Sequence, residues 1–197
     1  MDLDLTFRPV VAVAFFTIIA IALPFRIKSQ STGEKLDRTE EGVFTMIALR
    51  LGGLVLWGGV IAFMINPASM AWSSLPLPAT LRWSGVGLCV LTAALLIWTL
   101  RSLGKNLTDT VVTRQAHTLI TRGPYQWVRH PFYDCMFLLL IGTALMTANW
   151  FVMASGLVTF AILAARSRTE EEKLLERFGE PYRAYRARTG RFLPRVS

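Results

Sequence analysis

Residues Val43–Ile65 read VFTMIALRLGGLVLWGGVIAFMI, and this apolar run decides the fold class. Arg50 is its only charged residue, and the run slightly exceeds the ~20 residues that cross a bilayer as an α-helix. We expect the long Arg50 side chain to reach back to the membrane surface. Glycine pairs at 52–53 and 58–59 permit close contact with a neighbouring helix. The run therefore predicts a membrane-spanning helix.

Four other apolar stretches predict further spans: Pro9–Phe25, Leu81–Leu100, Phe132–Ala148 and Trp150–Ala165. The last two are shorter and meet at the joint 147–150, which predicts a helical hairpin. Of all 197 residues, 53% are hydrophobic and the mean hydropathy is +0.44, which is too apolar for an ordinary soluble domain. The sequence predicts a single domain, 1–197, of the all-α integral membrane class. It would have about five transmembrane helices and a cytoplasmic C-terminal helical segment.

The net charge of +8 is unevenly distributed along the chain. The loop 66–80 and the joint 147–150 contain no Lys or Arg, whereas segments 26–38, 101–129 and 166–195 are rich in them. The positive-inside rule therefore predicts an outside N-terminus and a cytoplasmic C-terminal tail. Attraction to anionic membrane lipids is the simplest role for most of these cations. They form no stripe interleaved with stacking aromatics, so we expect no nucleic-acid partner.

Metal chemistry is not expected from this composition. The only cysteines, Cys89 and Cys135, lie inside apolar spans and offer neither a disulfide framework nor metal-ligand spacing. His117 and His130 are the only histidines, so a zinc or di-iron site would lack ligands.

The tail after the fifth span changes from apolar to amphipathic. Leu174, Phe178, Tyr182 and Tyr185 recur at helical spacing and predict one apolar face. The sequence 179–181, Gly-Glu-Pro, interrupts this pattern, so we expect two short helices joined at Gly179. A lid over the mouth of the bundle and an anchor on the membrane surface are both compatible with this pattern.

The sequence RHPFY at 129–133 lies at the start of the predicted fourth span. Gly123 and His130 each precede a proline, which favours extended backbone at both residues. Pro131 would then occupy the first turn of the helix, where proline is preferred. We expect backbone N–H groups near this helix start to remain available for a ligand.

Arg166 and Glu170 lie four residues apart, hence on one face of a helix. Their pairing is either a surface ion pair of small energetic value or part of a site in the mouth of the bundle. Glu171 and Glu172 point elsewhere and are expected to be solvated. Tyr125 and Tyr133 could have a structural role instead of a role in a site, as aromatic residues at the membrane interface. The two histidines could likewise serve only to form hydrogen bonds in turns.

Taken together, these motifs resemble the isoprenylcysteine carboxyl methyltransferase family, whose relatives include membrane phospholipid and thiol methyltransferases. The resemblance rests on HTLI at 117–120, GPY at 123–125, RHPFY at 129–133, the glutamates 170–171 and FGxxYxxY at 178–185. It covers roughly 105–195, whereas the first spans match only as generic apolar helices. One departure is Asp134-Cys135 after Tyr133, because the family often has glycine two places after this tyrosine.

The resemblance implies S-adenosylmethionine as the cofactor. It divides the chain into transmembrane helices 1–3 in residues 1–103 and a cofactor-binding and catalytic half in 104–195. The implied cofactor-binding residues are His117, Thr118, Leu119, Ile120, Tyr125, His130, Pro131, Phe132, Tyr133 and Glu170. Arg166 would contact the substrate and act in catalysis together with Tyr133, and the active site would be cytoplasmic. Counting back from Phe178 assigns the cofactor carboxylate to Glu170, and a one-residue gap would move it to Glu171.

The acceptor implied by the resemblance is lipophilic: a small molecule or a prenylated substrate that reaches the site from the membrane lipids. A prenylcysteine or isoprenoid carboxylate is ionised at neutral pH and needs no general base. An amine or thiol acceptor would need one, from Glu170, Asp134 or Tyr133. Two other functions remain open, an NADPH-dependent membrane reductase of the sterol-reductase type and a non-catalytic lipid-binding protein.

Overall fold

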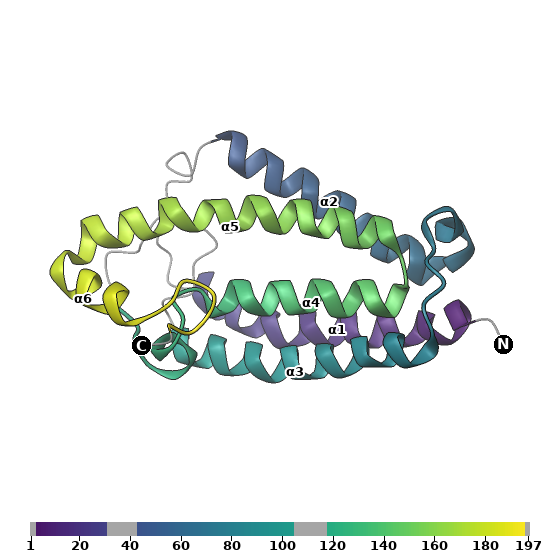
Figure 1. The fold of residues 1–197 in the computed structure, drawn as a ribbon, viewed down its shortest axis with the longest axis horizontal. Coiled ribbons are helices and arrows are strands. Elements are labelled where there is room, and N and C mark those ends of the chain that lie inside the picture. The colour runs from purple at the N-terminus through teal and green to yellow at the C-terminus, as the bar shows by residue number, and fades with distance from the viewer. Residues whose placement is uncertain (1–2, 31–42, 105–117, 196–197) are drawn as a thin grey trace.

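The structure, a computed structural model, describes residues 3–30, 43–104 and 118–195 (Figure 1). Its elements are α1 (Leu3–Gln30), α2 (Val43–Ile65), the 3-10 helix η2 (Pro67–Ser73), α3 (Ala79–Leu103), the 3-10 helix η4 (Gly123–Gln126), α4 (Pro131–Thr147), α5 (Trp150–Phe178) and α6 (Glu180–Arg188). Within the described ranges, β pairing is limited to two isolated bridges, Ser74 with Asn149 and Val128 with Gly190. The predicted all-α class is confirmed.

Five apolar helices correspond to the five predicted spans. In α1, α2, α3 and α5 the apolar sequence is long enough to cross a membrane, and α4 is a shorter apolar helix of 17 residues. The predicted first span ends at Phe25, but α1 contains Pro24 and continues to Gln30. Proline removes only one backbone donor, and helices in membranes tolerate this loss because neighbouring groups can satisfy the freed carbonyl.

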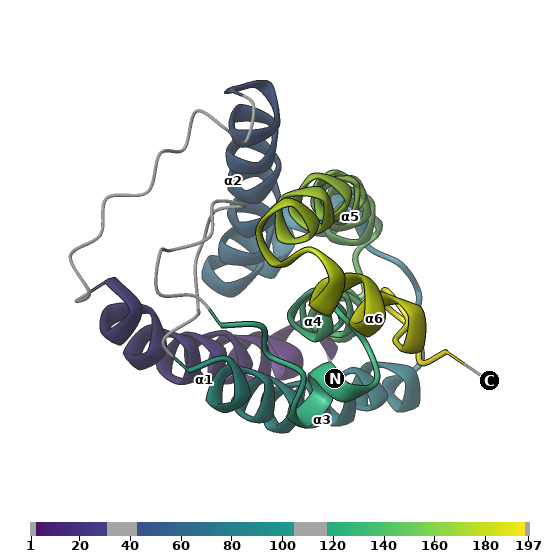
Figure 2. The ribbon, with the colours of Figure 1, turned by 90° about the vertical axis from the view of Figure 1, so that its left-hand side faces the viewer.

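An apolar cavity lies between three of the helices, α1, α2 and α4, and is called the central cavity below. Seen along the bundle (Figure 2), α2, α5, α4, α3 and α1 follow one another, with extensive packing of α3 on α4 and of α2 on α5. The cavity has a volume of about 290 Å³ and is lined by α1, α2 and α4, for example by Ile18, Trp57 and Leu139. An added Cβ would lie 2.7 Å from Thr159 Oγ1 at Gly52 and 3.2 Å from the Phe151 ring at Gly59, but it would meet nothing within 4 Å at Gly53 or Gly58. The predicted close approach is therefore confirmed for one glycine of each pair.

The joint between α4 and α5 forms the predicted tight hairpin. Ala148 has left-handed backbone (φ 47°) and ends α4. Asn149 caps the start of α5, because its Oδ1 accepts hydrogen bonds from the N–H groups of Phe151 and Val152, both at 3.1 Å. Its Nδ2 donates to Ser73 Oγ at 2.8 Å and so fastens η2 to the hairpin.

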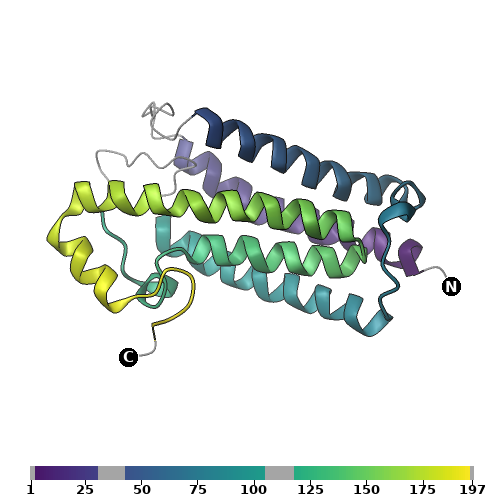
Figure 3. The same ribbon diagram turned by 45° about the horizontal axis from the view of Figure 1, so that its top comes forward.

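The tail departs from the predicted pair of short helices. Residues after the apolar part of the fifth span continue α5 without a break to Phe178, well past the start of α4 (Figure 3). No helix breaker occurs before Gly179, which is the predicted joint. Beyond it α6 folds back toward the bundle (Figure 1) and buries Tyr182 and Tyr185. The apolar face of α6 therefore packs on the protein.

Arg82 ties three helices together at the end of the bundle opposite α6. Its side chain is 3% exposed; Nε and Nη2 donate to the carbonyl of Met146 at 3.0 and 2.7 Å, and Nη1 pairs with Asp4 at 2.7 Å. The guanidinium carbon lies 4.3 Å from the centroid of the Phe7 ring. A cation at the C-terminal end of α4 is also favoured by the helix dipole.

Replacing Arg82 with alanine is expected to lower the free energy of unfolding by about 2 kcal/mol, because its hydrogen bonds to Asp4 and to the Met146 carbonyl are lost. Thermal unfolding of the detergent-solubilised protein measures the effect. Arg101→Ala is the matched control, since Arg101 lies exposed on the same helix. Equal melting temperatures for the two variants would contradict this role of Arg82.

Candidate active site

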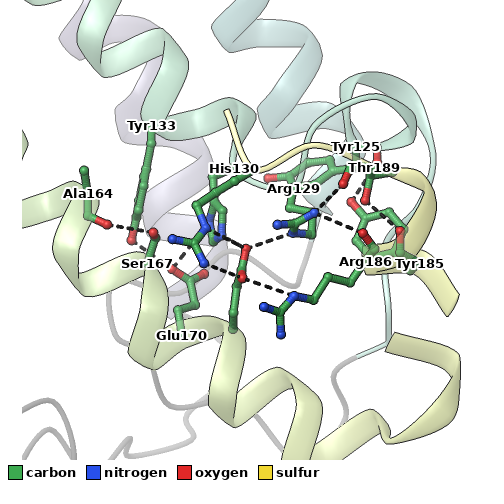
Figure 4. A network of polar contacts seen from close by, with 12 residues as sticks. Tyr125, Arg129, His130, Tyr133, Ala164, Ser167, Glu170, Tyr185, Arg186 and Thr189 are labelled. Carbon is green, nitrogen blue, oxygen red and sulfur yellow. Dashed lines mark hydrogen bonds and ion pairs between the residues drawn. The ribbon is translucent and has the colours of Figure 1, made fainter. Parts of the chain in front are cut away.

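Polar side chains meet at the end of the bundle where α4 begins, α5 becomes charged and α6 folds back (Figure 4). His130 is the residue immediately before α4, and Pro131 occupies the first helical position as predicted. This entrance holds His130 in a buried position with 5% exposure. Tyr133, one turn into α4, is buried beside it.

Glu170 of α5 faces these two residues. The hydroxyl of Tyr133 donates to Glu170 Oε2 at 2.8 Å, and His130 Nδ1 lies 3.8 Å from the same oxygen. The rings of His130 and Tyr133 stack with centroids 5.2 Å apart and an interplanar angle of 21°. The side chain of Glu170 is 31% exposed, so this carboxylate is accessible to a ligand.

Glu171 is buried, and the expectation that it is solvated is wrong. It is 2% exposed and sits among cationic groups. Arg129 Nε lies 2.8 Å and His130 Nε2 3.2 Å from its Oε1, while Arg191 Nη2 donates to its Oε2 at 2.9 Å. The side chain of Arg129 is itself only 9% exposed. A buried carboxylate requires such partners, and they hold α4, α5 and the C-terminal segment together.

The C-terminal segment 189–192 pairs with the chain before α4. Arg129 N–H donates to the Gly190 carbonyl at 2.9 Å, His130 N–H to the Arg191 carbonyl at 3.1 Å and Gly190 N–H to the Trp127 carbonyl at 3.1 Å. The N–H groups of Tyr133 and Asp134 donate to the His130 carbonyl. The predicted availability of N–H groups at this helix start is therefore wrong for these residues, because the tail and the local turn use them.

Tyr125 is buried in η4 and is held by α6. The hydroxyl of Tyr185 donates to the Tyr125 carbonyl at 2.7 Å. Burial raises the pKa of the Tyr185 phenol from its ordinary value of 10 to about 12. The predicted extended backbone at Gly123 is wrong: its φ is +62°, and an added Cβ would collide with Ser102 Oγ.

The other predicted site residues are distributed around this centre. His117 lies outside the described residues. Thr118 is exposed, and the segment 119–120 is half-buried ahead of η4. Arg166 is half-buried on α5, one turn before Glu170. The ring of Phe132 packs against α3 and Cys135, so a contribution of Phe132 to the site would come from its backbone.

Sequence reasoning missed the burial of Glu171 and its pairing with Arg129 and Arg191. A usable signal was present for Glu171, because it lies three residues before Leu174 and seven before Phe178, on the predicted apolar face. For Arg191 no local pattern exists, since its pairing depends on the return of the tail to α5.

The site suits an organic ligand with a positive charge. It offers an accessible carboxylate beside two stacked aromatic rings, which is a favourable environment for an onium group. In residues 3–30, 43–104 and 118–195, no group of three or more His, Cys, Asp or Glu side chains is arranged to hold a metal ion.

Part of the chain is similar to a known protein family. Residues 85–176 match the family model described as the isoprenylcysteine carboxyl methyltransferase family. The human protein-S-isoprenylcysteine O-methyltransferase is 36% identical over 94 residues, which are 46% of this chain and 33% of the human protein. The region that matches the family model, 85–176, contains the Arg129–Tyr133 segment and Glu170, whereas α6 and the C-terminal segment lie outside it.

Two bacterial relatives carry names that refer to metal resistance. The cobalt-zinc-cadmium resistance protein CzcN of Cupriavidus metallidurans is 36% identical over 146 residues, 72% of this chain and 63% of that protein. The nickel-cobalt-cadmium resistance protein NccN of Alcaligenes xylosoxydans xylosoxydans is 30% identical over 113 residues, 57% of this chain and 53% of that protein. The chain thus spans between 33% and 63% of the length of these three relatives.

A solved structure shares the fold. The eukaryotic intramembrane Ras methyltransferase, determined without a monobody, matches with a TM-score of 0.55 at 24% identity. The alignment covers 93% of this chain and 62% of the other.

Proposed function

Because residues 85–176 match the model of the isoprenylcysteine carboxyl methyltransferase family, we propose that the chain transfers a methyl group from S-adenosylmethionine to a lipophilic acceptor. The acceptor we propose is the carboxylate of a prenylcysteine-like or isoprenoid molecule. The observation that carries the proposal is the accessible carboxylate of Glu170 beside His130 and Tyr133, at one end of an apolar helical bundle.

The residues at this end fit the proposed cofactor. S-adenosylmethionine supplies an activated methyl group on a sulfonium cation when bound. Glu170 would attract the sulfonium or accept a hydrogen bond from the amino or ribose groups. Tyr125 and the segments 118–120 and 130–133 would surround the rest of the molecule, with His117 as a further predicted contact.

The central cavity supports a lipophilic acceptor. It is lined mainly by apolar side chains of α1, α2 and α4. Leu139 in its wall lies six residues after Tyr133, about 9 Å along α4. An apolar chain in this cavity would therefore place its polar end near the start of α4, and we propose that it enters from the membrane beside α2 and α4.

Arg166 would hold the acceptor. A carboxylate with a pKa of about 3.5 is ionised at neutral pH, so it can attack the methyl group without a general base. Arg166 would bind it by charge-assisted hydrogen bonds, one turn of α5 away from Glu170. Tyr133 would align the reacting groups, because it is fixed by Glu170 and stacked on His130. The main task of these residues is alignment and exclusion of water.

We propose that the N-terminus lies outside and that the active site and the C-terminus face the cytoplasm. The ends of the bundle differ in charge as the positive-inside rule requires, with the basic tail on the side of the site. Tryptophan is enriched at the two surfaces of a membrane, and a tryptophan pair lies near each end of the bundle, which supports a position of the bundle across the membrane. Trp72 and Trp150 pack 5.4 Å apart at one end, and Trp98 and Trp127 pack 5.5 Å apart at the other.

Equilibrium binding of S-adenosylmethionine and of NADPH to the detergent-solubilised protein tests the proposal. We expect S-adenosylmethionine to bind, and the double variant His130→Ala, Glu170→Ala to weaken its affinity about 100-fold through the loss of charge-assisted contacts. Glu172→Ala is the control, since Glu172 is exposed on the same helix.

Each other outcome selects a different function. Binding of NADPH alone would contradict methyl transfer and favour the reductase. A folded protein that binds neither cofactor would favour the lipid-binding function. Unchanged affinity in the double variant would overturn the assignment of these two residues.

A further inference from the structure

A third aromatic ring joins the His130–Tyr133 pair. The centroid of the Phe192 ring lies 5.7 Å from that of His130 and 6.4 Å from that of Tyr133. Phe192 comes from the C-terminal segment and is only half-buried, whereas the other two side chains are buried. Phe192 is thus the member of this group whose ring retains surface for a ligand.

The position of Phe192 is fixed by contacts on its N-terminal side. Arg191 binds Glu171 in a bidentate manner, with Nε 3.2 Å from Oε1 and Nη2 2.9 Å from Oε2. The Arg191 carbonyl accepts the His130 N–H at 3.1 Å. These two contacts of Arg191 fix the backbone directly before Phe192, so the Phe192 ring has a defined position.

We propose that Phe192 is a cofactor-binding residue, and that its ring forms an aromatic cage for the sulfonium group together with His130, Tyr133 and the carboxylate of Glu170. The negative face of an aromatic ring attracts a desolvated cation, and aromatic cages are the usual receptors for organic onium ions. Glu170 supplies the compensating charge within the same cluster. This inference rests on the proposed function, because it names a further contact to the proposed cofactor.

The charge on sulfur provides a specific test. S-adenosylmethionine is a sulfonium cation, whereas S-adenosylhomocysteine has a neutral thioether at the same place. Isothermal titration of both ligands should show that Phe192→Leu lowers the affinity for S-adenosylmethionine about fivefold and that for S-adenosylhomocysteine less than about twofold. Phe192→Tyr, which keeps the aromatic face, should retain the wild-type ratio of affinities.

Leu193→Ala is the matched control, because this neighbour is 79% exposed. Fluorinated phenylalanine at position 192 repeats the test without a change of shape, since fluorine withdraws charge from the ring face; it should also lower the preference for S-adenosylmethionine. An equal loss of affinity for both ligands, or no loss, would overturn the role of Phe192. If the wild-type protein binds neither ligand, the proposed function itself fails, so the two failures are distinguishable.

Discussion

Replacing Arg166 with alanine is expected to lower kcat/KM on the order of 1,000-fold, because two charge-assisted hydrogen bonds of roughly 1.5–3 kcal/mol each would be lost. The affinity for S-adenosylmethionine should change little, because in the proposed arrangement Arg166 binds the acceptor and Glu170 the cofactor. Transfer of labelled methyl to a farnesylcysteine analogue, together with cofactor titration, separates the two effects.

Arg168→Ala is the matched control for this prediction. Arg168 lies two residues further along α5 and is exposed, so its removal subtracts the same charge from the same helix. Retained turnover in Arg166→Ala, or an equal loss in both variants, would contradict a role of Arg166 in binding the acceptor.

Replacing Glu171 with alanine is expected to lower the free energy of unfolding by about 3–5 kcal/mol, because the buried guanidinium of Arg129 would lose its counter-charge. Arg129 and His130 would remain buried with no carboxylate at hydrogen-bonding distance, and Arg191 would release the C-terminal segment. Thermal unfolding in detergent measures the loss of stability. The rate of proteolytic cleavage in the C-terminal segment measures its release from the protein.

The neighbouring residue provides the comparison for Glu171. Glu172 carries the same charge one position later but is exposed, so Glu172→Ala should leave the melting temperature nearly unchanged. Equal melting temperatures for the two variants would show that the contacts of Glu171 do not stabilise the fold. Because both variants remove one negative charge, comparing them separates the loss of the Glu171 contacts from the effect of a change in net charge.

Helix-level features were largely predictable because their causes are local. The apolar length of each stretch, the joint at 147–150 and the break at Gly179 depend on neighbours within a few residues, and the structure contains all of them. Pro131 at the first position of α4 follows from its fixed φ angle. The local rule for a residue before proline failed at Gly123, whose φ is +62° and which lies so close to Ser102 that an added Cβ would collide with it.

The pairing of Tyr133 with Glu170 shows how far motif resemblance reaches. Both residues were singled out from the sequence, and they are in contact although 37 positions separate them. The resemblance placed both residues in one implied cofactor site, and their direct contact comes from the structure. Their roles with cofactor and acceptor stay predictions until ligands are measured.

By itself, the sequence determined the membrane class, the helices and the chemistry-bearing residues at the start of α4, because hydropathy and turn propensity act over short distances. Only the tertiary structure decided that Glu171 is buried while Glu172 is exposed, and that Phe192 lies against His130. The physical reason is that burial of a charge depends on which partners the fold brings to it. The partners of Glu171 come from residues 129–130 and 191, which meet only when the C-terminal segment returns to the entrance of α4.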